Sequence, residues 1–408
     1  MNADKAERYA NLIPMAELDT ADKRLQPFDI FNKLRGNSPV RYDESRSCWD
    51  VFRYEDVHRI LKDPATFSSV RKLAGRDTIL TMDPPRHTQM RAIVNKAFTP
   101  KVVNDLAPHI ASIADELLNA AADKGQMDLV RDLAVPLPVI VIAELLGVPP
   151  KDRHLFKEWS DLLVKEPEVN TDEAFHQVMT EKAQAMKELN DYFAAIVAER
   201  RKEPKEDLIS LLLAAEIEGQ QLNDEELHGF CILLLAAGNE TTTNLITNAV
   251  RRLTEDPELQ PQLHGQPERI PGFIEEVLRY YPPIQAIGRI ATQDVEIHGT
   301  RIQAGQQVVS WVASANRDEA KFPEPDRFDM TRKPNPHLSF GFGTHFCLGA
   351  PLARLEGQVV IQHLLERLEA IEFVAGSELT TIQSPFVYGV KQFPVRFRAR
   401  AEAGLSKA

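Results

Sequence analysis

The segment Phe340–Gly349, FGFGTHFCLG, places one cysteine among three glycines. Glycines let the backbone approach a bound group closely, and the amides that begin the helix predicted after Cys347 stabilise a thiolate. The glycine spacing differs from the dinucleotide pattern GxGxxG, and no strand–helix nucleotide unit surrounds it. Because Cys48 and Cys231 are the other cysteines, a four-cysteine zinc or iron–sulfur site is impossible. Two roles fit Cys347: a small buried apolar residue or a single thiolate ligand, which suits haem iron.

A second group that could do chemistry is Glu240 with Thr241, inside a long helical pattern. Asn223 and Glu226 resemble a capping box, and no proline follows before Thr254, so a helix of roughly 45 Å is predicted at 1.5 Å per residue. The preceding run CILLLAA is apolar on every face and should be buried. Glycine, threonine and a carboxylate are poor choices for a buried helix. Either the helix reaches the surface at Glu240, or a buried acid and alcohol lie where it is locally widened.

Long helical patterns dominate the chain and must position both groups. The predicted helices are Val102–Ala122, Ala174–Arg201, Asn223–Thr254 and Leu348–Ile371. Strand patterns are short and cover Trp49–Arg53, a hairpin-like stretch Asp294–Ala313, and Phe393–Phe397. Both halves of the chain contribute strands, so sheets must join distant segments. We therefore expect a mainly α protein with small β-sheets, folded as a single large domain over residues 1–408.

Composition excludes several classes of protein. Of 408 residues, 43% are hydrophobic and 26% charged, which is ordinary for a globular protein. The formal charge of −12 disfavours nucleic acid as a partner. No run of 18 apolar residues occurs, and the first residues are polar, so we expect neither a membrane anchor nor a signal peptide. Three dispersed cysteines suit a reducing compartment. We expect a cytoplasmic monomer.

The motifs together resemble the cytochrome P-450 family in its soluble bacterial form. FGFGTHFCLG matches the haem-ligand signature FGxGxHxCxG at every fixed position. Glu276 and Arg279 resemble the ExxR pair, and Pro325–Phe328 supplies Arg327 as their partner. AGNETT, beginning at Ala237, resembles the oxygen-activation motif, and DPPRHTQMR, residues 83–91, resembles the haem-contacting helix. The resemblance implies a P-450 fold with a long central helix over haem b, and dioxygen as co-substrate.

Roles for individual residues follow from this resemblance. Cys347 would be the axial thiolate, with Phe340 near the sulfur. Glu240 and Thr241 would deliver the protons needed to cleave dioxygen, and small residues, Ala237 and Gly238, would leave room for it. Glu276, Arg279 and Arg327 would form a buried structural network, which is costly to break. The remaining haem contacts implied by the family are His87, Arg91, Ala237, Arg289, His345 and Gly349, of which the first two share one helix face.

The substrate walls are predicted from position in the family fold. They are nearly all apolar, which suggests a hydrophobic fatty acid, terpenoid or steroid. The predicted wall residues are Leu73, Ile79, Leu80, Leu233, Leu234, Ile284, Gln285, Ile287, Phe386 and Val387.

The leading hypothesis is a monooxygenase that receives electrons from NAD(P)H through a ferredoxin reductase and a ferredoxin. Two segments, 84–104 and 331–355, lack acidic residues, which predicts a basic docking face for an acidic ferredoxin. Alternatives are a peroxide-driven peroxygenase and a non-catalytic haem sensor or ligand carrier, neither of which needs an acid–alcohol pair. The cations of the predicted docking face are Arg86, Arg91, Lys96, Lys101, Arg332, Lys333 and Arg354.

Overall fold

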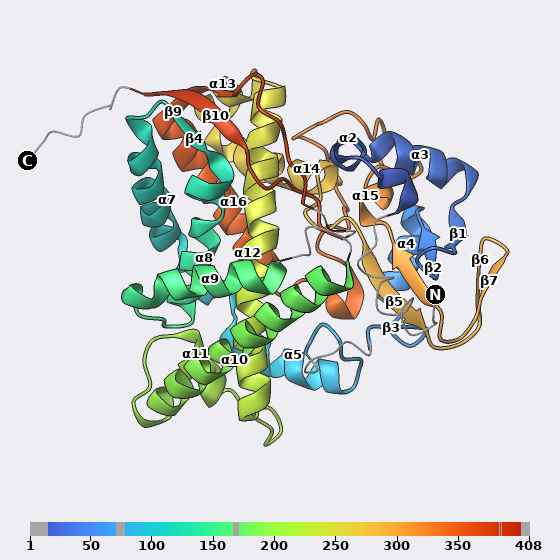
Figure 1. Cartoon of the computed structure of the whole chain (residues 1–408), viewed down its shortest axis with the longest axis horizontal. Helices are drawn as coiled ribbons and strands as arrows, with labels where there is room; N and C mark the ends of the chain where they lie inside the picture. Colours follow the sequence, from blue (N-terminus) through green and yellow to red (C-terminus); the bar gives the residue numbers. More distant parts are fainter. Residues whose placement is uncertain (1–14, 71–77, 166–170, 383, 385, 401–408) are drawn as a thin grey trace, which may run out of the picture.

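Helix α12 (Asp224–Glu255) runs through the centre of the helical part of the molecule (Figure 1). The computed structural model describes residues 15–70, 78–165, 171–382, 384 and 386–400. Asn223 caps this helix: its Oδ1 accepts a hydrogen bond from the Glu226 amide at 2.9 Å, and the Glu226 carboxylate accepts one from the Asn223 amide at 3.0 Å. The predicted capping box and long helix are confirmed. Residues 224–255 are α-helical throughout, so the expected local widening at Glu240 is wrong.

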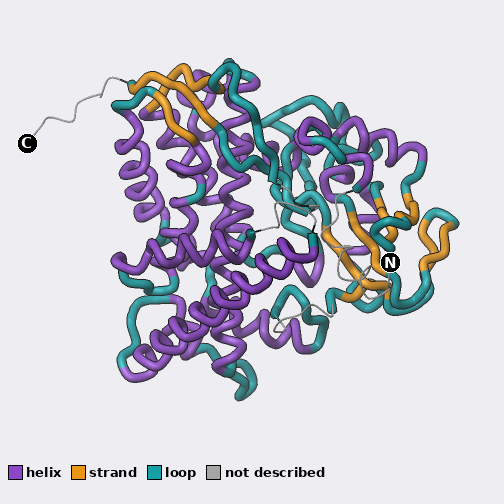
Figure 2. The backbone as a smooth tube through the Cα atoms, in the orientation of Figure 1, coloured by secondary structure: helices purple, strands orange, loops and turns teal. Residues whose placement is uncertain are grey.

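Other helices surround α12 in the helical part (Figure 2). Those that contact it are α8 (Pro136–Leu145), α9 (Arg153–Val164), α10 (Asp172–Lys202), α14 (Ile270–Tyr280) and α16 (Ala350–Arg367). Further helices here are α5 (Arg86–Ala97), α6 (Pro100–Asn104), α7 (Ala107–Ala122), α11 (Leu208–Ala214) and α13 (Leu259–Gly265). The central seam is tight, because a Cβ on Gly238 would lie 3.2 Å from Ile142 Cδ1 of α8.

Two predicted helices end differently from expectation. The pattern Val102–Ala122 is split into α6 and α7, because Pro108 is tolerated only in the first turn of a helix. The pattern Leu348–Ile371 is shortened at both ends: α16 has its own proline, Pro351, in the first turn. The last residues of the predicted helix instead begin a strand, β9 (Leu368–Phe373), whose main chain pairs with β10 (Pro394–Ala399). Helix α10 agrees with the predicted Ala174–Arg201.

The sheets join distant parts of the chain, as expected. The largest has the order β1-β2-β8-β5-β3, and a three-stranded sheet has the order β4-β10-β9. The strands are β1 (Val40–Asp43), β2 (Cys48–Val51), β3 (Phe67–Ser68), β4 (Gln126–Asp128), β5 (Ile287–Ala291), β6 (Val295–Ile297), β7 (Thr300–Ile302), β8 (Gln307–Ser310) and β10 (Pro394–Ala399). Around the large sheet lie α2 (Ala21–Leu25), α3 (Phe28–Asn37), α4 (Tyr54–Lys62) and α15 (Val312–Ala315).

The strand predictions are confirmed with shifted ends. The stretch Asp294–Ala313 forms a tight hairpin, β6 with β7, whose turn uses His298 and Gly299 at positive φ. Strand β8 follows and pairs with β2 in parallel and with β5 in antiparallel fashion. The end of the predicted strand is wrong, because Val312 and Ala313 belong to α15. The observed mainly α fold with small sheets matches the predicted fold class.

Within the described part of the chain, no helix is both long and apolar enough to cross a membrane.

Candidate active site

Cys347 lies at the end of a tight loop between α15 and α16. Its amide donates to the Phe340 carbonyl at 2.8 Å, which closes the loop. Gly341 and Gly343 adopt positive φ values of 71° and 69°, where other residues are strained. A Cβ on Gly343 would also lie 3.1 Å from the Leu61 carbonyl oxygen of α4. Both the backbone conformation and this close approach therefore favour glycine at position 343. The loop thus fixes the position of the thiol.

The three thiols have different environments. Cys48 and Cys231 are buried, whereas Cys347 is exposed. Desolvation by the surrounding protein raises the pKa of Cys347; the amides of Gly349 and Ala350 and the charges of Arg91 and Arg354 act in the opposite direction. Gly349 lets the backbone lie close, since a Cβ there would be 4.0 Å from Sγ. Cys347 is therefore an accessible thiol near positive charge, as a metal-binding thiolate requires.

Two imidazoles and two arginines gather beside this loop. The ring centroids of His87 and His345 are 4.2 Å apart, and His345 Nε2 lies 3.0 Å from Ser69 Oγ. Burial and the neighbouring charges of Arg289, His87 and Arg91 lower the pKa of His345 to about 3. Burial, then Arg91, lowers the pKa of His87. Both imidazoles are neutral at pH 7, so the arginines carry the positive charge.

This donor set fits a haem group. His87 is 1% exposed, yet neither of its ring nitrogens has a hydrogen-bond partner, and such a buried group is costly unless something binds it. Among the described residues, no carboxylate forms an ion pair with Arg91. Cations and imidazole donors are the groups that bind two propionates. Nor does any set of three His, Cys, Asp or Glu side chains in the described ranges have the arrangement of a metal site.

The acid–alcohol pair lies on α12. Burial raises the pKa of Glu240 to about 7, and the charge of Lys182 on α10 opposes that rise. Thr241 Oγ1 donates to the Ala237 carbonyl at 2.8 Å, which leaves its lone pairs able to accept a further hydrogen bond. Ala237 is exposed although it lies in the middle of a packed helix. Gly238 accommodates a close contact with α8, and its part in leaving room for dioxygen stays a prediction.

A second buried acid was missed by the sequence reasoning. Glu356 of α16 is 2% exposed, and burial raises its pKa to about 8, against a hydrogen bond from Thr242. Its Oε1 has no hydrogen-bond partner. The signal was present in the sequence, because Leu352, Glu356 and Val360 are spaced four apart and share one helix face. Both flanking residues are apolar and buried.

The predicted network around Glu276 contains one wrong residue. Arg279 binds the Glu276 carboxylate at 2.7 and 2.9 Å, and both are fully buried. The third cation is Arg332, whose Nε lies 3.3 Å from Glu276 Oε1. Arg327 has a side chain that is 64% exposed and pairs with Glu324; only its carbonyl oxygen accepts from Arg279, at 3.2 Å. The sequence motif located the segment correctly but named the wrong arginine.

The structure brings some predicted substrate-wall residues together. Ile284 forms a β-bridge with Val387, and the Gln285 amide donates to the Phe386 carbonyl at 2.7 Å. Ile79 is buried in the same apolar cluster against which Leu233 and Leu234 pack, and Ile287 packs against another cluster. Leu80 is 52% exposed, and Leu73 lies outside the described residues. The wall assignments stay predictions.

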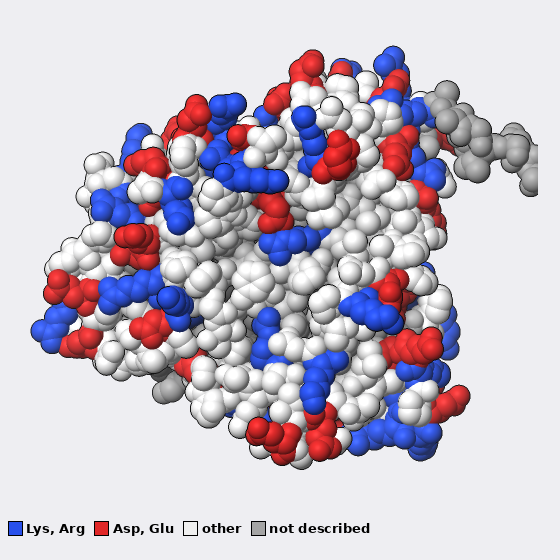
Figure 3. All heavy atoms as spheres, turned by 180° about the vertical axis from the view of Figure 1, so that it is seen from behind, with Lys and Arg blue, Asp and Glu red and all other residues white. Residues whose placement is uncertain are grey.

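Most cations of the predicted docking face are already engaged. Arg354 binds Glu275, Arg332 binds Glu276, Arg86 binds Glu226, and Lys96 Nζ donates to a carbonyl. Lys101 lies 3.6 Å from Asp105, and Arg91 belongs to the site itself. Figure 3 shows acidic and basic side chains interspersed on one face of the molecule, without a continuous basic patch there. The charge pattern of the sequence therefore overstated the free positive charge.

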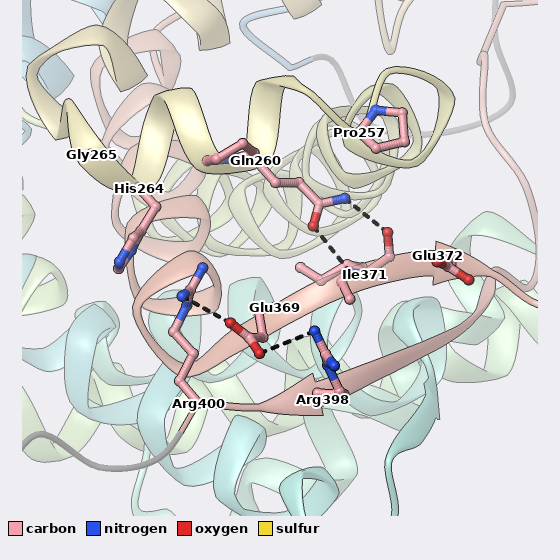
Figure 4. Close-up of a pocket in the computed structure, with 11 residues that line it drawn as sticks. Pro257, Gln260, His264, Gly265, Glu369, Ile371, Glu372, Arg398 and Arg400 are labelled. Carbon is pink, nitrogen blue, oxygen red and sulfur yellow. Dashed lines mark hydrogen bonds and ion pairs between the residues drawn. The ribbon is translucent and has the colours of Figure 1, made fainter.

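A separate hollow of about 470 Å³ lies between α13 and the strands β9 and β10 (Figure 4). Gln260 bridges to the main chain of Ile371 at 2.8 and 3.0 Å, and Glu369 pairs with Arg398 and Arg400. None of the predicted site residues lines it. It lies beyond the far end of α16 from Cys347 and is not part of the candidate site.

An exposed thiol in a glycine-containing loop beside Arg91 and two imidazoles, on a mainly helical fold with small sheets, is the arrangement of a haem-thiolate protein. The family model for cytochrome P450 matches residues 13–393. Cytochrome P450 109 of Bacillus spizizenii is 54% identical over 395 residues, which are 97% of each chain. Crystal structures of CYP109E1 from Bacillus megaterium, substrate-free and in complex with corticosterone, are 45% identical; they cover 92% of this chain and 100% and 99% of their own, with TM-scores of 0.88 and 0.87.

The chain therefore belongs to the cytochrome P450 family. It is a monooxygenase whose cofactor is haem with a thiolate-ligated iron and whose co-substrate is dioxygen. The family resemblance inferred from the sequence is confirmed.

Proposed function

We propose that this enzyme hydroxylates a steroid-class substrate and that Cys347 is its haem ligand. The observation that carries the ligand assignment is the accessible thiol in a glycine-closed loop beside Arg91. The steroid class is supported by the corticosterone complex of a relative that is 45% identical. It is also supported by the apolar predicted walls, which would bury a large hydrophobic molecule. Fatty acids and terpenoids are the other classes that such walls admit.

The residues divide the work as follows. Arg91, His87, Arg289 and His345 would hold the propionates, and Cys347 would hold the iron. Haem supplies the binding and activation of dioxygen at that iron. With a pKa of about 7, Glu240 can both take up and release a proton at neutral pH, which is the property of an efficient proton donor.

Thr241 would hold a water that takes up the proton released by Glu240 and passes it toward the site. Its hydroxyl hydrogen is directed to the Ala237 carbonyl, so its oxygen accepts a hydrogen bond and holds a water beside the small side chain of Ala237. The Glu240–Thr241 pair supports a dioxygen-dependent enzyme over a peroxygenase or a ligand carrier, because neither alternative needs a proton relay.

Electrons would come from NAD(P)H through ferredoxin reductase and ferredoxin. Lys333 and Lys101, the latter in an exposed pair with Asp105, lie at the surface, and they support a smaller docking site than the sequence predicted. A cytoplasmic location is supported by the free state of all three cysteines. The monomeric state stays a prediction that light scattering of the purified enzyme tests.

A spectral titration of the ferric enzyme tests the substrate class. Testosterone, corticosterone, a long-chain fatty acid and a terpenoid are added in turn, and the Soret band is followed. A steroid that displaces the axial water shifts the band to shorter wavelength at lower concentration than the others.

Turnover with reductase and ferredoxin is then compared with turnover by hydrogen peroxide. Tighter binding of a non-steroid refutes the substrate class, and turnover by peroxide alone refutes the dioxygen-dependent relay.

A further inference from the structure

Glu275 of α14 connects two segments that flank the cysteine loop: helix α16, through Arg354, and the segment before the loop, through His337. This carboxylate of α14 accepts two hydrogen bonds from Arg354 of α16, at 2.6 Å from Nε and 2.9 Å from Nη2. It also lies 3.2 Å from His337 Nε2. The Ser339 amide donates to His337 Nδ1 at 3.3 Å, so Nε2 is the ring nitrogen that faces Glu275. Arg354 with Glu275 forms a pair of zero net charge.

The cation of this pair lies against the cysteine loop. The guanidinium carbon of Arg354 is 4.4 Å from the centre of the Phe340 ring, and the Phe340 carbonyl accepts the hydrogen bond from the Cys347 amide. Arg354 also interacts electrostatically with Cys347. Two parallel hydrogen bonds to a carboxylate fix the plane of a guanidinium. Both side chains are about one-third exposed, at 30% and 31%, so water screens them less than a surface pair.

We propose that Arg354 and Glu275 are positioning residues that set how readily the haem iron accepts an electron. Arg354 brings a positive charge to Phe340 and Cys347, and Glu275 both holds that charge in place and compensates it. The inference rests on the proposed ligand, Cys347. One-electron reduction of ferric to ferrous haem adds one negative charge, and it makes or breaks no bond at either residue. An uncompensated positive charge nearby therefore favours reduction, and an uncompensated negative charge opposes it.

The test is a spectroelectrochemical titration of the haem-loaded enzyme, with the electrode supplying the electron. Glu275→Gln leaves Arg354 uncompensated, so we expect a more positive potential. Arg354→Gln leaves the carboxylate uncompensated, so we expect a more negative one. Each shift should correspond to a change on the order of tenfold in the equilibrium constant, the effect of one partly screened charge, or about 59 mV for one electron. The double variant should return close to the wild-type value.

Two further variants separate charge from structure. Arg354→Lys keeps the charge without the two parallel hydrogen bonds, and its potential should stay nearer the wild type than that of Arg354→Gln. Glu372→Gln changes the net charge of the chain equally, in an exposed pair with Arg396. That pair lies beyond the C-terminal end of α16, about 20 Å along the helix from Arg354 at 1.5 Å per residue, and we expect no shift. If Glu275→Gln does not retain haem, the two Arg354 variants still test the charge.

Shifts of the same sign in both single variants would overturn the proposal, because loss of structure alone moves them together. A potential unchanged in Arg354→Gln, or a shift equal to that of Glu372→Gln, would also overturn it. Failure of the proposed function is recognised separately. In that case the reduced carbon monoxide complex of the wild type lacks the long-wavelength Soret band of a thiolate-ligated haem, or Cys347→Ser retains it.

Discussion

Replacing Glu240 with glutamine should remove a pH dependence from the stability of the enzyme. Burial raises the pKa of this acid from 4.5 to about 7. The folded state thus binds the proton more tightly than the unfolded state, so the stability that the neutral acid provides is complete below pH 4.5 and is lost as pH rises through 7. At 1.36 kcal/mol per pKa unit, the full loss is about 3 kcal/mol, and about 2 kcal/mol of it falls between pH 5.5 and 8.

Urea unfolding of the haem-loaded enzyme, followed by circular dichroism at several pH values, measures this loss. Glu240→Gln cannot ionise, so the stability of the variant relative to the wild type should rise by about 2 kcal/mol from pH 5.5 to 8. Glu296→Gln, an exposed glutamate on β6, is the matched control and should run parallel to the wild type. Product formed per NAD(P)H should fall at every pH in Glu240→Gln. A stability difference independent of pH would show that Glu240 is ionised and solvated in the folded enzyme.

Three other changes have expected outcomes. Thr241→Ala should keep haem and substrate binding but release reducing equivalents as peroxide, so product per NAD(P)H falls sharply; unchanged coupling would contradict the relay. Cys347→Ser should abolish the long-wavelength band of the reduced carbon monoxide complex, whereas Cys48→Ala should keep it, and the reverse pattern would refute the ligand assignment. Arg332→Ala should lower the free energy of unfolding by about 3 kcal/mol, because it leaves Glu276 with one buried cation fewer. The exposed Arg327→Ala should cost less than about 1 kcal/mol, and equal losses would restore Arg327 to the network.

The sequence predicted those features of the site that depend only on residues close together in the chain. The capping box at Asn223 and the glycine positions around Cys347 depend on residues a few positions apart, and both are as expected. The choice between Arg327 and Arg332 depends on which of two nearby side chains turns inward toward Glu276. No spacing rule contains that information, because it is settled by packing against α14.

Which basic side chains remain unpaired at the surface was the feature that the sequence predicted least well, because this too depends on tertiary packing. A segment without acidic residues looks basic only until the fold supplies acids from elsewhere. Arg354 meets Glu275 from 79 residues away in the sequence, and Arg86 meets Glu226 from 140 residues away. The Glu226 carboxylate comes from α12, a helix that the sequence predicted but could not place, and the Glu275 carboxylate comes from α14. The free charge of a surface is therefore a property of the tertiary structure.

The threonine run of α12 shows how such placement explains an unfavourable sequence. Successive residues of a helix point about 100° apart, so Thr241, Thr242 and Thr243 face three directions. Thr241 donates to the Ala237 carbonyl beside the site, Thr242 bonds Glu356 of α16, and Thr243 donates to the carbonyl of Ala134 at 2.9 Å. Each hydroxyl hydrogen-bonds to a different polar group near the centre of the fold. The low helix propensity of threonine is offset by these bonds, and only one of the three is available for chemistry.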